Sequence, residues 1–213
     1  MTKETMNVHK ALSELKTLDS RIYGAINETA FITTNKHSNQ KISGVPVAEF
    51  CKNMEAGHDK VTDLIRRRDA IKRAVVLSNA TTKVTIAGKE YTVAEAIEMK
   101  NHGVELKKTL LGNMRIAYTK AKQAADRANG DELERRADEY VKSLYGNTDM
   151  KNVSDDVKKV RADFIAAQTV ELVDPLKVTE KIEALEGEIS AFMVDVDSAL
   201  SVSNAMTSIS VEY

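Results

Sequence analysis

The stretch Ser78–Glu95, SNATTKVTIAGKEYTVAE, constrains the fold more than any other part of the chain. Its first residues favour helix ends and turns. The β-branched or aromatic runs 83–86 and 89–92 flank Ala87-Gly88, a pair suited to a two-residue hairpin turn in which Gly supplies a positive φ. Thr92 and Glu95 have the spacing of a capping box. The stretch therefore predicts a helix end, a β-hairpin and a new helix start.

The rest of the sequence is patterned mainly as helix. Apolar residues recur at spacings of three and four over about 8–28, 47–77, 93–129 and 176–201, with two shorter helical segments between 131 and 174. Only two prolines occur in 213 residues, which favours long uninterrupted helices. We expect a mainly α fold of long antiparallel helices, bundle-like or coiled-coil-like, in a single elongated domain over 1–213 with a helical insertion at 130–173.

A second copy of the central motif closes the chain. Residues 203–211, SNAMTSISV, match 78–86, SNATTKVTI, at four identical positions, and both follow an apolar helix. The match predicts a helix-then-strand unit used twice. We expect the C-terminal strand, 207–212, to join the hairpin, 82–92, in one small antiparallel sheet, because a third strand stabilises an isolated hairpin. The alternative is coincidence within a segment rich in Ser, Thr and Ala.

Composition narrows the class of protein. Hydrophobic residues make up 42% and charged residues 30%, so the chain can bury a core and stay soluble. The net charge of −1 argues against duplex DNA and anionic membranes as general partners. Cys51 is the only cysteine, which excludes an intrachain disulfide. The first residues contain no apolar signal core, and no window is apolar enough to span a membrane, so we expect a cytoplasmic protein.

Residues that carry chemistry are scattered. The four histidines form no HxH, HxxxH or HExxH pair, which argues against a metal site. Cys51 has no histidine near it in the sequence, and neither a GxSxG motif nor a P-loop is present. We therefore expect no catalytic residues, no metal and no cofactor, and a protein that is not an enzyme.

Two basic clusters lie on predicted helices. Arg67 and Arg68 belong to the first cluster, just before the hairpin. In the second, Arg115, Tyr118 and Lys122 fall at i, i+3 and i+7 and so share one helix face. An arginine for phosphate, a ring for base stacking and a lysine for charge would suit a nucleotide. The alternative is a solvated face with one tyrosine packed in the core.

The central segment RRRDAIKRAVVLSNATTKVTIAGKEYTVAEAIEMK resembles the middle of a family of conserved helical proteins of bacteria and phages, which has no assigned function. Its members have a long helix ending in N-A-T, a short hairpin turning on Gly, and a helix opening T-x-x-E-A. The C-terminal VDPLKVTEKIEALEGEI and SNAMTSI are similar to its closing helix and strand. The matched parts cover about half of the chain, and 120–172 departs from the bacterial members.

Two functional hypotheses follow. The chain is similar in type to the phage sponges that sequester the cyclic-nucleotide signals of bacterial immunity (anti-CBASS proteins), which implies a non-enzymatic, homo-oligomeric binder of such a signal. Its site would combine Arg115, Tyr118 and Lys122 with charge from Arg67 and Arg68 across a subunit interface. The alternative is a structural or assembly protein, a virion or scaffold component, that acts through protein–protein contacts.

Overall fold

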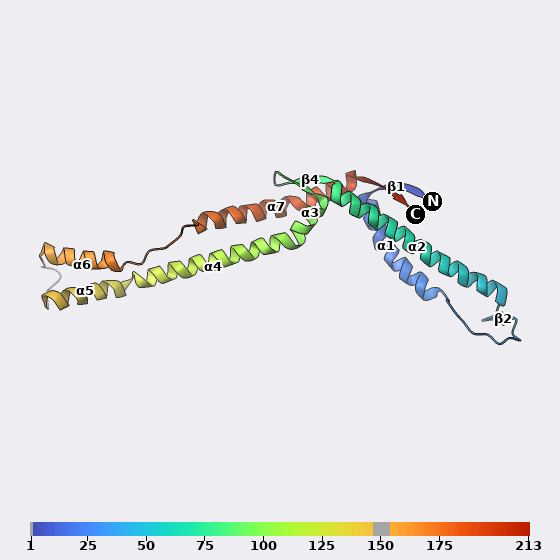
Figure 1. Ribbon diagram of the computed structural model, residues 1–213, viewed down its shortest axis with the longest axis horizontal. Coiled ribbons are helices and arrows are strands. Elements are labelled where there is room, and N and C mark those ends of the chain that lie inside the picture. The colour runs from blue at the N-terminus through green and yellow to red at the C-terminus, as the bar shows by residue number, and fades with distance from the viewer. Residues whose placement is uncertain (1, 147–153) are drawn as a thin grey trace. The chain divides into compact units, whose positions relative to one another are not determined.

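The computed structural model describes residues 2–146 and 154–213 (Figure 1). The chain divides into two units. Unit 1 consists of Met1–Gly103 and Ala191–Tyr213, and unit 2 of Val104–Ser190. The chain passes between them twice, once after Gly103 and once within its last long helix. Each unit is described by itself below.

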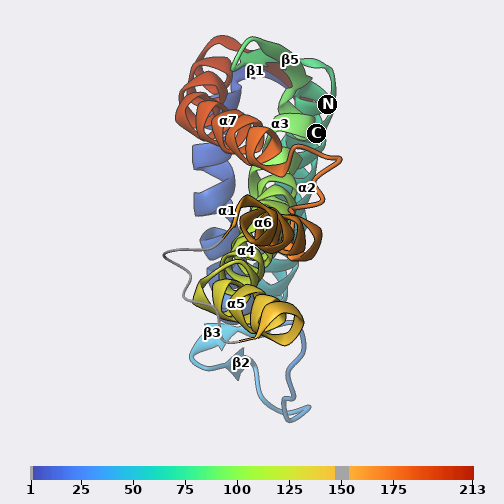
Figure 2. The same cartoon turned by 90° about the vertical axis from the view of Figure 1, so that its left-hand side faces the viewer.

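Two antiparallel helices, α1 (Val8–Glu28) and α2 (Val47–Thr81), form the largest part of unit 1. The two short strands β2 (Lys41–Ile42) and β3 (Val45–Pro46) pair between them. Figure 2 shows these strands at the opposite end of the helix pair from β1. The apolar stripes of α1 and α2 face each other, and Leu18 of α1 and Ile71 of α2 are fully buried. This packing confirms the helical periodicity.

The chain ends pair with each other. Strand β1 (Lys3–Asn7) runs antiparallel to β6 (Ser208–Glu212), and backbone hydrogen bonds join Thr2 and Tyr213 beyond the strands. Met6, Ile209 and Val211 point from this sheet onto α1 and α2. The prediction that strand 207–212 joins the hairpin was wrong. Strand β6 pairs with the N-terminal strand instead, and Met6 of β1 lies in the same core cluster as Ile209 and Val211 of β6.

The hairpin forms a separate sheet, and its local signals are confirmed. Strands β4 (Lys83–Ile86) and β5 (Lys89–Thr92) pair antiparallel. The turn residues Ala87 and Gly88 have φ of 49° and 75°, the left-handed conformation that glycine adopts without strain. Thr92 then caps α3 (Val93–Glu98) through a complete capping box with Glu95. A π-helical turn, Met99–Gly103, follows α3.

The repeated motif forms the same structure twice. Helix α2 ends at Thr81 and leads into β4, and α7 (Val178–Met206) ends at Met206 and leads into β6. In both copies the threonine between helix and strand accepts a hydrogen bond from the first residue of another helix: Val93 donates to Thr82, and Val8 donates to Thr207. Corresponding positions of the two copies are buried: Val84 corresponds to Ile209, Ile86 to Val211, Ile71 to Val196, and Ala96 to Ala11. The predicted helix-then-strand repeat is confirmed.

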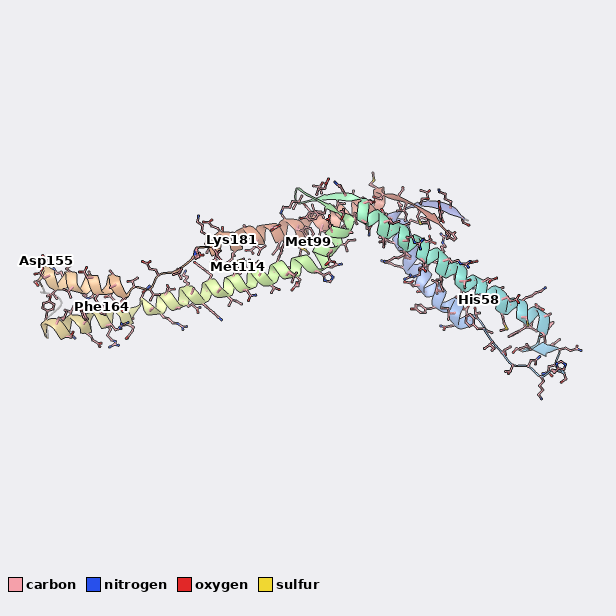
Figure 3. The ribbon with its side chains drawn as sticks, viewed as in Figure 1. His58, Met99, Met114, Asp155, Phe164 and Lys181 are labelled. Carbon is pink, nitrogen blue, oxygen red and sulfur yellow. The ribbon has the colours of Figure 1, made fainter. Side chains whose placement is uncertain are left out.

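Unit 2 contains α4 (Val104–Ala128), α5 (Asp131–Tyr145), α6 (Asp155–Gln168) and the first part of α7. Helices α5 and α6 pack on each other within the predicted insertion, 130–173. The rings of Tyr140 and Phe164 stack with centroids 4.7 Å apart. Figure 3 labels Phe164 on α6. Arg161 of α6 forms ion pairs with Glu134 and Asp138 of α5. The fold class is therefore mainly α, with long antiparallel helices and small two-stranded sheets.

Candidate interaction surfaces

Arg67 lies in a half-buried polar cluster on α2, under the sheet of the chain ends. Its Nε donates to Glu14 of α1 at 2.5 Å, one Nη donates to Glu4 of β1 at 2.9 Å, and the other donates to the Tyr213 hydroxyl. The guanidinium also lies over the Tyr213 ring, 4.8 Å from its centroid. One side chain thus connects α1, α2, β1 and the C-terminus.

Electrostatics in this cluster favour the charged forms. The hydrogen bond to Glu14 raises the pKa of Arg67 above its ordinary value, although partial burial opposes the shift. The hydrogen bond from Arg67 lowers the pKa of the Glu4 carboxyl. Because carboxylates and a hydroxyl occupy all three nitrogens, this arrangement makes Arg67 a structural residue of unit 1.

Arg68, next along the chain, faces solvent. It forms ion pairs with Asp19 of α1 at 2.7 Å and with its neighbour Asp69 at 3.1 Å. The hydrogen bond to Asp19 is the main reason that the pKa of Arg68 is raised. Sequence reasoning grouped Arg67 and Arg68 as one source of charge, whereas in the structure the Arg67 side chain is 20% exposed and the Arg68 side chain is 38% exposed.

The other predicted site residues share one face of α4 in unit 2. Arg115 pairs with Glu186 of α7 at 2.5 Å, and both side chains are about half exposed. Tyr118 is half-buried, and Lys122 is exposed. Within this face Lys107 also pairs with an acid of α7, Glu188, at 3.1 Å. The basic side of α4 thus faces the acidic first part of α7. Whether these residues bind a ligand stays a prediction.

A groove in unit 1 was not anticipated from the sequence. It has a volume of about 530 Å³ and runs between β4 and the end of α7. Asp195, which lines it, accepts a hydrogen bond from the backbone of the hairpin turn at Ala87. Its other lining residues are mostly small, hydroxylic or apolar: Thr82, Lys83, Val84, Thr85, Ser198, Ala199, Val202, Ser203, Met206 and Thr207. The repeated motif could have indicated this groove, because residues of both copies, 78–86 and 203–211, line it.

A second face of α4 has large apolar residues open to solvent. Leu106 is 73% exposed and Leu110 is 54% exposed. Farther along the same face every apolar position is an exposed alanine, at Ala117, Ala121, Ala124 and Ala128. The sequence analysis did not identify this face.

Other classes of site find little support in the part of the chain that the structure describes. Residues 2–146 and 154–213 contain no group of three His, Cys, Asp or Glu side chains arranged to hold a metal ion. Across the same residues, no helix combines the length and apolar character needed to cross a membrane.

A scan against protein-family models found no match, and searches of the curated proteins and of the solved structures found none either. The family resemblance stays a prediction.

Proposed function

We propose that this protein acts by binding and not by catalysis, as a homo-oligomeric helical assembly or scaffold protein that works through protein–protein contacts. The observation that carries the proposal is the large surface of the single chain. Its accessible area is 14859 Å².

That area exceeds what a folded monomer of this mass exposes. A 23.5 kDa monomer with ordinary burial would expose about 9,800 Å². Two separately folded bodies with the sizes of units 1 and 2 would expose about 11,700 Å² together, so the division into units does not account for the surplus. Obligate homo-oligomer interfaces bury roughly 1,000–2,500 Å² of each partner, so the surplus of one chain is large enough for such an interface.

The surplus includes apolar side chains that a helical partner could cover. In the described part of unit 2, large apolar residues that are exposed outnumber the buried residues of its core. Contiguous exposed apolar surface is typical of protein–protein interaction sites. Helical arms that leave such faces open are commonly completed by further helices in symmetric bundles.

The mass in solution tests this proposal. Light scattering across a hundredfold range of protein concentration should give a fixed multiple of 23.5 kDa that falls only at the lowest concentrations. The melting temperature should rise with protein concentration, because assembly stabilises the folded state by mass action. A mass of one chain throughout, with a concentration-independent melting temperature, would contradict the proposal.

A second candidate function is the sequestration of a nucleotide signal by such an oligomer. It is favoured by the face of α4 that carries Arg115, Tyr118 and Lys122 together. A sponge acts by stoichiometry, so it needs nanomolar binding, about −12 kcal/mol.

A thermal-shift screen against cyclic di- and trinucleotides tests this second candidate, with the ligand recovered chemically intact. Arg115→Ala and Lys122→Ala should abolish the shift, whereas Arg135→Ala, an ion-paired and exposed arginine of α5, should not. An unchanged thermal shift in both α4 variants would show that the binding site lies elsewhere. If no nucleotide shifts the melting temperature of the wild type, the nucleotide hypothesis is wrong and only the scaffold function stays proposed.

A further inference from the structure

The exposed face of α4 is built to pack against the same face of a second copy. We propose that two chains associate through α4 in an antiparallel pair, with the twofold axis passing at Ala117. This inference rests on the proposed homo-oligomer and specifies the surface that forms it. The face is defined as the positions Leu106, Leu110, Asn113, Ala117, Ala121, Ala124 and Ala128.

The seven positions form one continuous strip. Their successive spacings are four, three, four, four, three and four, so at 3.6 residues per turn they stay within about a quarter of the helix circumference. All seven are exposed in the single chain. Asn113, the polar member, donates its side-chain amide to Thr109 of its own helix at 3.1 Å. The strip is about 33 Å long at 1.5 Å per residue.

The order of the spacings reads the same in both directions from Ala117. In an antiparallel pair centred there, Leu106 lies opposite the partner's Ala128, and Leu110 lies opposite the partner's Ala124. Each large side chain thus meets a small one along the whole contact, which lets two helix backbones keep one close separation. A parallel pair would set leucine against leucine at one end and alanine against alanine at the other. The antiparallel pair also opposes the two helix dipoles favourably.

The residues beside the strip are compatible with this pairing. On one side, Lys120 faces the partner's Ile116, so the lysine stem can cover an apolar side chain that is 54% exposed in the single chain. On the other side, Met114 faces the partner's Tyr118, a favourable contact between sulfur and ring. Arg127 lies on the same side as Lys120 and faces the partner's Thr109, so neither of these two cations meets a like charge.

The exposed area of the chain is large enough for an interface between two α4 helices. The chain exposes several thousand Å² more than a monomer of its mass, and an obligate dimer needs roughly 1,000–2,500 Å² from each copy. Val104 and Leu111, which lie on another side of α4, are already buried in the single chain. The opposite, leucine-and-alanine face is therefore the one left for the partner.

A cysteine at the axis tests the register. In a Cys51→Ser background, which removes the one native and exposed thiol, Ala117→Cys should form an intermolecular disulfide in nearly all molecules under mild oxidation. Residues on a close twofold axis reach the short Cα separation that a disulfide requires. Thr119→Cys in the same background is the matched control, because it is equally exposed but lies on the other side of α4. It should stay mostly unlinked.

A charge at the axis supplies a second test. Ala117→Glu would place two carboxylates against each other and should reduce the light-scattering mass at least twofold, whereas Thr119→Glu should leave it unchanged. A wild-type protein of one-chain mass would overturn both the homo-oligomer and the seam. A wild-type oligomer that survives Ala117→Glu, with no Ala117→Cys cross-link, would overturn the α4 seam alone.

Discussion

Units 1 and 2 are both helical, but they differ in how they bury their apolar residues. In unit 1, two sheets cover helices, and its buried residues outnumber the large apolar ones left exposed among the residues described. In unit 2 the balance is reversed, and α4 has an entire open face. Because burial of apolar surface is the main driving force of folding, unit 1 buries more of its apolar residues within one chain, and we propose that a second copy covers those left open in unit 2.

Removing core volume from unit 1 should have the largest effect. Ile71→Ala deletes a fully buried side chain between α1 and α2, and we expect a loss of about 3 kcal/mol in the free energy of unfolding. Ile65→Ala, on the same helix but 38% exposed, should cost clearly less. Urea denaturation of both variants checks this. Equal losses would mean that the core of unit 1 does not lie where the structure places it.

Breaking the Arg67 cluster should have the next largest effect. Arg67→Met removes the cation paired with Glu14 and leaves Lys10 as the cation beside Glu4, and we expect a loss of about 2 kcal/mol for this half-buried group. Arg68→Met removes an exposed arginine and should leave the denaturation midpoint nearly unchanged. If Arg67→Met were as harmless as Arg68→Met, the cluster would not hold the chain ends on the helices.

The helix cap after the hairpin should contribute less to the free energy of unfolding. Thr92→Ala removes the side chain that accepts from the Glu95 backbone at 3.2 Å, and we expect a loss of about 1 kcal/mol. Thr92→Ser keeps the hydroxyl and should recover most of it. A full loss in the serine variant would assign the effect to the strand propensity of threonine in β5 and not to the cap.

The smallest effect concerns pH. Arg67 lowers the pKa of Glu4 in the folded protein, so the stabilisation is present above the unfolded carboxyl's pKa, near 4.5, and is lost as the pH falls through the lower folded value. The decrease in denaturation midpoint between pH 6 and pH 3 should therefore be shallower in Glu4→Gln than in the wild type. Glu28→Gln, at the exposed end of α1, is the control. Identical pH slopes in the wild type and Glu4→Gln would contradict the assigned pairing.

The sequence predicted local structure well because local interactions determine it. The turn at Ala87-Gly88, the capping box at Thr92 and the repeated helix-then-strand unit each depend on residues within a few positions of one another. The partner of β6 depends on contacts between residues about 200 positions apart. Lys3–Asn7 contains one large apolar residue, Met6, so nothing in its pattern marked it as the strand that pairs with β6.

Site prediction met a similar difficulty. A run of three arginines in a helix must point in different directions, and only the packing of α1 and β1 decides that Arg67 is the one enclosed. The open face of α4 was readable in principle, since its spacings are helical. It becomes distinct only when the structure shows that Val104 and Leu111 are buried on another face.

The most direct test of the account is amide hydrogen exchange measured at several protein concentrations. As concentration rises, exchange should slow more in residues 104–128 than in the buried parts of α1 and α2, because assembly covers α4 directly. Protection that is independent of concentration in α4, or that changes only in unit 1, would contradict the claim that the chain is completed by a second copy through unit 2.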